Sequence, residues 1–163
     1  MQFGLIRMIL IILLLTGCNA MDRSSAVEVT SEMNEVISDY IIHYYEKAYM
    51  KTDEQFEVHK IYGAKKIGNV TTVYLYSLYS GFNKETKTEG QSGHSVPAII
   101  KLKDENGKYV VSYYKEPSDG DDFKNTLYKI FPRKYAAQAL NDTENLAGLQ
   151  DELQQKAEAW LRN

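Results

Sequence analysis

The stretch VTTVYLYSLYSGF, at residues 70–82, decides the fold that this sequence predicts. It is dominated by β-branched and aromatic residues, which is typical of a β-strand. Adjacent residues of a strand point to opposite faces of the sheet, and here both sets are largely apolar. A strand with two apolar faces needs cover on both sides, so the stretch predicts a sheet packed between two layers. The set on one face is Val70, Tyr74, Tyr76 and Leu78, and the set on the other is Val73, Leu75 and Tyr79.

Three further runs of strand-forming residues surround this stretch. FEVHKIYGAKKIG (56–68) precedes it across a Gly-Asn turn pair, and SVPAIIKLK (95–103) and KYVVSYYKE (108–116) follow a polar loop at 83–94. The Asn-Gly pair between the last two runs is a strong hairpin signal. Every connection is too short for the crossover helix that parallel strands require, so we expect four antiparallel strands in sequence order.

A helix is predicted before the strands. In TSEMNEVISDYIIHYYEKAYM (30–50) apolar residues recur every three or four positions, which is the spacing of one helical face. Thr30 or Ser31 is a suitable N-cap, because either hydroxyl can accept from the free N–H groups of the first turn. We expect this helix over about 31–50, covering one face of the sheet.

Two or three helices are predicted after the strands. DDFKNTLYKIFP forms one candidate, and Pro132 suits the first turn of the next. Asn141 and Thr143 are candidate caps for the last helix. That helix would carry an apolar stripe that either packs on the sheet or curls round its end, formed by Leu146, Leu149, Leu153, Ala157 and Trp160. The predicted fold class is α+β: an N-terminal helix, a four-stranded antiparallel meander and two or three C-terminal helices.

The N-terminal residues predict export and a lipid anchor. Arg7 precedes an unbroken apolar run at 8–15 and two small residues, the order found in secretory signal peptides. The run is far shorter than the roughly 20 residues that span a bilayer. The single cysteine, Cys18, ends the sequence Leu-Thr-Gly-Cys, which resembles the lipobox of bacterial lipoproteins. The resemblance implies cleavage before Cys18 and diacylation of its sulfur, and two acyl chains give stable anchoring to a membrane.

These features divide the chain into three expected segments. They are a lipoprotein signal peptide at 1–17, the lipidated Cys18 with a polar tether at 18–29, and a single α+β domain at 30–163. Loss of the first segment removes Arg7 and no acidic residue, so the formal charge would change from −3 to −4. A nucleic-acid partner calls for a concentrated basic face, which this evenly mixed, mildly acidic sequence lacks. With one cysteine no intramolecular disulfide is possible, so packing alone would stabilise the domain outside the cell.

A second resemblance covers residues 61–160. VYLYSLYSGF, GQSGHSVPAIIKL, NGKYVVSYYKEPSDGDDFKNTLYKIFP and LQDELQQKAEAWL together resemble a small domain found in surface lipoproteins of Gram-positive bacteria. Similar domains occur as extracytoplasmic parts of membrane metallopeptidases of the β-lactam-sensor type, but the zinc-binding pattern H-E-x-x-H is absent here. The resemblance therefore implies sensing or binding outside the cytoplasm, with no reaction and no cofactor.

Two groups of residues that contain histidine are candidates, one for a catalytic pair and the other for a zinc site. Ser92 and His94 lie close together in the polar loop, but the pattern departs from G-x-S-x-G. Residues two apart in a loop rarely reach the geometry of a nucleophile and its base, so we expect a turn with a solvated His94. His43, His59 and His94 fall on a helix, a strand and a loop without the spacing of metal ligands, so we expect no zinc site.

The segment Glu-Pro-Ser-Asp-Gly-Asp-Asp at 116–122 is the most acidic in the chain. Its carboxylates offer oxygen ligands to calcium, although the EF-hand pattern is missing. The alternative that we favour is structural: Ser118 or Asp119 caps the following helix, and the other acids complement the positive end of its dipole.

Tyrosine occurs thirteen times, which favours either a large core or a recognition surface. We expect most of these side chains in the core and some of those on the sheet in an exposed groove. The function predicted is a lipid-anchored binding or sensing module for a peptide, a cell-wall fragment or another envelope protein. The alternative is an extracytoplasmic hydrolase with no recognisable motif, and no residue set supports catalysis. The tyrosines considered for the ligand surface are Tyr74, Tyr76, Tyr79, Tyr113 and Tyr114.

Overall fold

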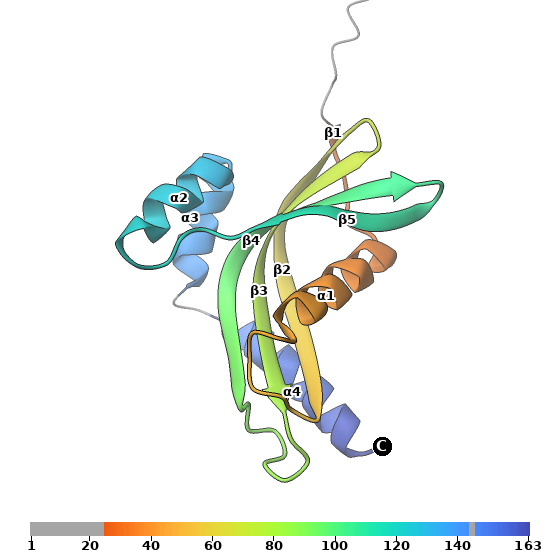
Figure 1. Ribbon diagram of the computed structural model, residues 1–163. Helices are drawn as coiled ribbons and strands as arrows, with labels where there is room; N and C mark the ends of the chain where they lie inside the picture. The colour runs from red at the N-terminus through yellow and green to blue at the C-terminus, as the bar shows by residue number, and fades with distance from the viewer. Residues whose placement is uncertain (1–24, 144–145) are drawn as a thin grey trace, which may run out of the picture.

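The computed structural model describes residues 25–143 and 146–163, which form one antiparallel sheet with helices on both faces (Figure 1). The order of strands in the sheet is the order in the sequence. The α+β class and the antiparallel meander are thus confirmed. The strands are β1 (Ser25–Ala26), β2 (Glu54–Ile67), β3 (Val70–Phe82), β4 (Ser92–Glu105) and β5 (Lys108–Lys115).

The sheet has five strands in the structure, so the prediction of four is wrong. The additional strand β1 has only two residues and lies within the segment predicted as a tether. Ser25 pairs with Lys66 and Ala26 with Lys65, and the Val27 N–H donates to the Ala64 carbonyl at 3.2 Å. So short a strand carries no alternating pattern, and only its pairing with β2 defines it.

The strand β3 lies in the middle of the sheet and is covered on both faces, as its sequence predicts. Val73 and Leu75 are fully buried on the face that α1 (Ser31–Tyr45) covers. Tyr74 and Tyr76 are buried on the other face, beneath the C-terminal helices. Figure 1 shows α1 and α4 on opposite sides of the strands.

The helix α1 begins where predicted and ends earlier. The Thr30 hydroxyl accepts from the Met33 N–H at 3.3 Å, which confirms the cap. The helix ends at Tyr45 and not near residue 50, and the Ala48 N–H donates to the Tyr45 carbonyl in a tight turn at 2.9 Å. The turn brings the Tyr49 ring onto Tyr79, with 5.6 Å between ring centroids, so packing on the sheet overrides the helical pattern.

Three α-helices and a 3-10 helix follow the sheet among the described residues. The apolar stripe of the last helix packs on the sheet, with Leu153, Ala157 and Trp160 beside Val58 and Phe82. Within this part of the chain, no helix is both long and apolar enough to cross a bilayer. The elements are η1 (Gly120–Asp122), α2 (Phe123–Ile130), α3 (Arg133–Asp142) and α4 (Ala147–Leu161).

The predicted caps of these helices differ from the observed ones. Pro132 directly precedes α3, close to its predicted place. Asn141 lies inside α3, and the Thr143 hydroxyl donates to the Ala139 carbonyl at 3.0 Å, so both residues belong to the end of α3 and neither caps α4. Asp119 precedes η1 without a side-chain cap bond. A short helix whose first N–H groups face solvent has water as an alternative partner.

Candidate functional site

The outer edge of β2 is open over most of its length. The strand β1 pairs with Lys65 and Lys66 only, and the chain then turns into α1. Among the described residues, no strand pairs with residues 54–61 of β2 on that side. We call this part of the strand the open edge. An open edge presents backbone N–H and C=O groups that can pair with another strand.

One contact identifies which backbone groups face outward. The ammonium of Lys156, on α4, donates to the Glu57 carbonyl at 2.9 Å, so the backbone of Glu57 faces away from β3. In an antiparallel strand the N–H and C=O of one residue point to the same side, and the side alternates along the chain. The backbone N–H and C=O of His59 therefore also point outward, while those of Val58 and Lys60 point to β3.

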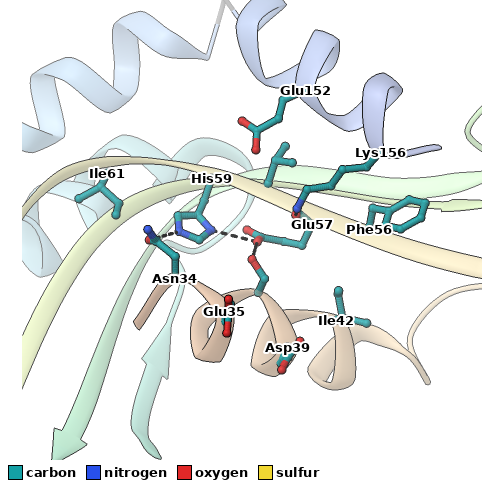
Figure 2. A pocket seen from close by; sticks show the side chains of 12 residues that line it. Asn34, Glu35, Asp39, Ile42, Phe56, Glu57, His59, Ile61, Glu152 and Lys156 are labelled. Carbon is teal, nitrogen blue, oxygen red and sulfur yellow. Dashed lines mark hydrogen bonds and ion pairs between the residues drawn. The ribbon is translucent and has the colours of Figure 1, made fainter. Parts of the chain in front are cut away.

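A cleft of about 450 Å³ lies over the open edge, and we call it the edge cleft. Side chains from both faces of β2 border it, with Glu57 and His59 on one face and Phe56 and Val58 on the other. Side chains of opposite faces can border one cleft only where it lies across the edge of the sheet. Figure 2 shows this arrangement, with α1 on one side of the strand and α4 on the other.

Beneath the edge cleft lies a network of hydrogen bonds around Glu57, which is 1 % exposed. The Ser38 hydroxyl of α1 donates to Glu57 Oε2 at 2.7 Å, and the Ser77 hydroxyl of β3 donates to Oε1 at 2.7 Å. His59 Nδ1 lies 3.0 Å from Glu57 Oε2, and His59 Nε2 lies 3.0 Å from Asn34 Oδ1 (Figure 2). The network ties α1 to β2 and β3.

The network holds Glu57 as a carboxylate. Burial alone would raise the pKa of Glu57, but hydrogen bonds from His59, Ser77 and Ser38 and the charge of His59 outweigh it, and the pKa lies below its ordinary value. Both ring nitrogens of His59 lie within hydrogen-bond distance of oxygen atoms, Glu57 Oε2 and Asn34 Oδ1. Glu57 and His59 thus form a buried hydrogen-bonded pair whose polar atoms have partners within the protein.

This geometry does not suit nucleophilic catalysis. A serine nucleophile needs its hydroxyl hydrogen-bonded to a base that a third group orients. Here the Ser38 hydroxyl donates to the carboxylate of Glu57, and both nitrogens of His59 already have partners. The network therefore positions the cleft floor, and neither Glu57 nor His59 is free to act as the base of such a serine.

The rim of the edge cleft is acidic. Glu35 and Asp39 of α1 and Glu152 of α4 line it and are exposed to solvent. Among the described lining residues, Lys156 is the only lysine or arginine. A positive ligand would therefore be attracted to this cleft.

The five tyrosines predicted for a ligand surface do not share one. Tyr74, Tyr76 and Tyr79 are only 4 %, 2 % and 2 % exposed, so they are core residues that offer almost no surface to a ligand. Tyr113 is 41 % exposed, with the Lys101 ammonium 5.0 Å from its ring centroid. Tyr114 is half-buried against the core beside α1. The prediction of an exposed groove is wrong for the three core tyrosines because helices cover both faces of β3.

Ser92 and His94 lie in β4 and not in a loop. The prediction of a solvated His94 is wrong, because its ring packs at a tilt against Tyr45, with 4.0 Å between ring centroids, and stacks on Tyr79, with 5.5 Å between them. Burial lowers the pKa of His94, although the nearby carboxylates of Glu116 and Glu57 act in the opposite direction. Neither ring nitrogen, nor the Ser92 hydroxyl, has a hydrogen-bond partner among the described residues, so the two residues are not paired as nucleophile and base.

The other polar groupings remain apart in the described residues. His43 is exposed at the end of α1 and lies 3.3 Å from Glu46, while His59 belongs to the Glu57 network. No cluster of three metal-ligating side chains occurs in the described part of the chain, the acidic segment 116–122 included.

The fold and the site together define an α+β domain with an acidic cleft over an open sheet edge. Comparison with known protein families, with curated proteins and with solved structures finds no match to this chain. Glu57 is a residue that the sequence analysis missed, and His59 was considered there only as a metal ligand. Glu57 and His59 alternate with apolar residues in the strand sequence FEVHKI and so share one face of the strand, which is the signal that could have paired them.

Proposed function

We propose that this protein is a lipoprotein, held at the outer face of the cell membrane through Cys18, and that its domain binds a ligand of the envelope without transforming it. The observation that supports binding is the edge cleft, where outward-facing backbone groups of β2 lie beneath an acidic rim. The ligand would be a peptide, a cell-wall fragment or a segment of another envelope protein. The same role is what the sequence resemblance to surface lipoproteins of Gram-positive bacteria would imply.

Binding is favoured over hydrolysis by the state of the polar groups. Glu57, His59 and Ser38 have their hydrogen bonds within the protein, and so are unavailable to activate a water or a substrate. A site that binds needs rigid walls, which this network supplies by tying α1 to the sheet. We therefore do not propose the hydrolase alternative.

The anchor would keep the domain near the membrane. Seven residues lead from Cys18 to Ser25, where β1 begins, and an extended chain spans at most about 3.6 Å per residue. The lipid and the sheet would then lie within about 25 Å of each other, which favours a ligand in the layer next to the membrane.

Two measurements test this proposal. Mass spectrometry of the native protein is expected to find the chain starting at a diacylated Cys18. An intact segment 1–17 with a free thiol would overturn the anchor.

The second measurement is capture of a partner from envelope extract by residues 19–163. A variant with Glu35→Lys, Asp39→Lys and Glu152→Lys is expected to lose capture. A control with the same charge change at three exposed acids outside the cleft, Glu85→Lys, Glu89→Lys and Asp121→Lys, is expected to keep it. Capture by the cleft variant as strong as that by the control would place the binding site outside the edge cleft. No capture by the unmodified domain would remove the binding role.

A further inference from the structure

We propose that the open edge of β2 binds an extended, cationic peptide segment as an added strand of the sheet. This inference rests on the proposed binding function and names its ligand class and its mode of recognition. Peptides that add a strand to a sheet edge gain affinity from backbone hydrogen bonds and specificity from the side chains of alternate residues.

The backbone of β2 is arranged for such a strand. β1 pairs with β2 beside Lys65 and Lys66, and after Val27 the chain turns away from β2 to form α1. A peptide on the open edge would lie beside β2 in line with β1. The alternation set by the Glu57 carbonyl makes Gln55, His59 and Ile61 the other outward-facing residues. Seven residues of peptide, about 24 Å at 3.4 Å each, would cover this stretch.

The Lys156 ammonium occupies the position that a peptide N–H would take at the Glu57 carbonyl. Lysines on sheet edges prevent unwanted pairing in natural proteins. Lys156 is otherwise exposed on α4 and has a flexible stem, so its ammonium can move into solvent when a peptide binds. We therefore infer that Lys156 weakens binding in general and repels cationic ligands in particular.

The side chains around the cleft determine the charge pattern of the ligand. Side chains of an added strand would point alternately towards α1 and towards α4. Glu35 and Asp39 lie on the α1 side, so basic residues are expected at every second position. Phe56 and Val58 lie on the other face of β2, so β-branched residues are expected at the peptide positions between the basic ones.

The probe that fits this description is the peptide acetyl-Thr-Lys-Val-Lys-Val-Lys-Thr-amide. Calorimetric titration of residues 19–163 is expected to detect binding that weakens with added salt. The same peptide with glutamate in place of lysine is expected to bind at least about tenfold more weakly, because like charges then face each other. Equal binding of the two peptides, or no binding of the lysine peptide at 1 mM, would overturn the inference.

A pair of N-methylated peptides separates strand addition from attraction between charges. One carries N-methyl groups on its three lysines and the other on the residues between them. In an added strand the N–H groups of alternate residues donate to β2, so only one of the two peptides loses hydrogen bonds on methylation. That peptide is expected to lose about 10- to 100-fold in affinity, while the affinity of the other changes little. Two N-methylated peptides that both bind like the parent would show charge attraction alone.

Variants of the protein complete the test. Lys156→Gln is expected to bind the lysine peptide several-fold more tightly, and the pair Glu35→Lys and Asp39→Lys at least about tenfold more weakly. A second copy of the chain is the other possible occupant of the edge. Sedimentation that finds a dimer which the peptide does not dissociate would assign the edge to that copy and overturn the inference. Envelope capture that survives the charge reversal would refute this inference and leave the proposed binding function standing.

Discussion

Replacement of His59 by leucine tests the Glu57 network most sharply. Glu57 is 1 % exposed and receives two hydroxyl hydrogen bonds besides its contact with His59. Removal of the imidazole takes away the partner that most lowers the pKa of this buried carboxylate, and loss of one partner of a buried charged pair costs about 3–5 kcal/mol in other proteins. In a domain of this size about 1 kcal/mol corresponds to about 4 °C in Tm, so His59→Leu is expected to lower Tm by roughly 12–20 °C.

The pH dependence of the loss identifies its cause. In the unmodified protein the pKa of Glu57 lies below its ordinary value of 4.5, so its contribution is present above that pH and is lost as the pH falls through the folded-state pKa. Without His59, burial would raise the pKa of Glu57 above the unfolded value. The difference between the two proteins should then be largest at pH 7 and smaller near pH 4.5.

Urea unfolding of both proteins, followed by the fluorescence of Trp160, measures this difference at the two pH values. The double variant His59→Leu with Glu57→Gln is expected to be more stable at pH 7 than His59→Leu alone, because it removes the unpaired charge. A loss below 1 kcal/mol at pH 7, or one that is equal at both pH values, would refute the claim that His59 stabilises the buried carboxylate of Glu57.

Three further results are expected, each with its own control. Tyr76→Ala should lower the free energy of unfolding in urea by about 3–5 kcal/mol, because the ring is 2 % exposed. Tyr113→Ala should change it by less than about 1 kcal/mol, because that ring is 41 % exposed, and similar losses for the two variants would contradict the placement of the rings. Gly93→Ala should lower Tm, because a Cβ there would lie 2.1 Å from a carbonyl oxygen of β3. Gly148→Ala, at a helical position with open space around it, should keep or raise Tm, and a lower Tm for this variant than for Gly93→Ala would disprove the close approach of β3 and β4. Cys18→Ser should move the protein from the membrane fraction to the soluble fraction on cell fractionation, and an unchanged distribution would argue against lipidation at this residue.

The sheet was predictable from the sequence because its strands are long and its turns are specific. The alternation in β3 identifies both buried faces, and the Asn106-Gly107 pair forms the expected turn, with φ of 58° and 87°. The apolar stripe of α4 is also visible in the sequence, which left open whether it packs on the sheet or curls round its end; in the structure it packs on the sheet. The strands, their turns and the stripe itself depend on residues that are close in the chain.

The rest of the structure depends on contacts between distant segments, which no local pattern records. His94 is buried because Tyr45, from α1, packs against it across the sheet face. The site at Glu57 combines α1, β2, β3 and α4, and its cleft exists because β1 stops after Ala26. The sequence could not predict that an edge would remain open there, since strand order and strand length together decide it.

Amide hydrogen exchange at the open edge, measured by NMR, tests the central claim most directly. In the free protein the N–H groups of Glu57 and His59 are expected to exchange faster than those of Val58 and Lys60, which face β3. At a concentration of lysine peptide that saturates the protein, Glu57 and His59 should become as slow as their neighbours. Equal protection of all four residues in the free protein, or no change on binding, would contradict an edge that is open and accepts a strand.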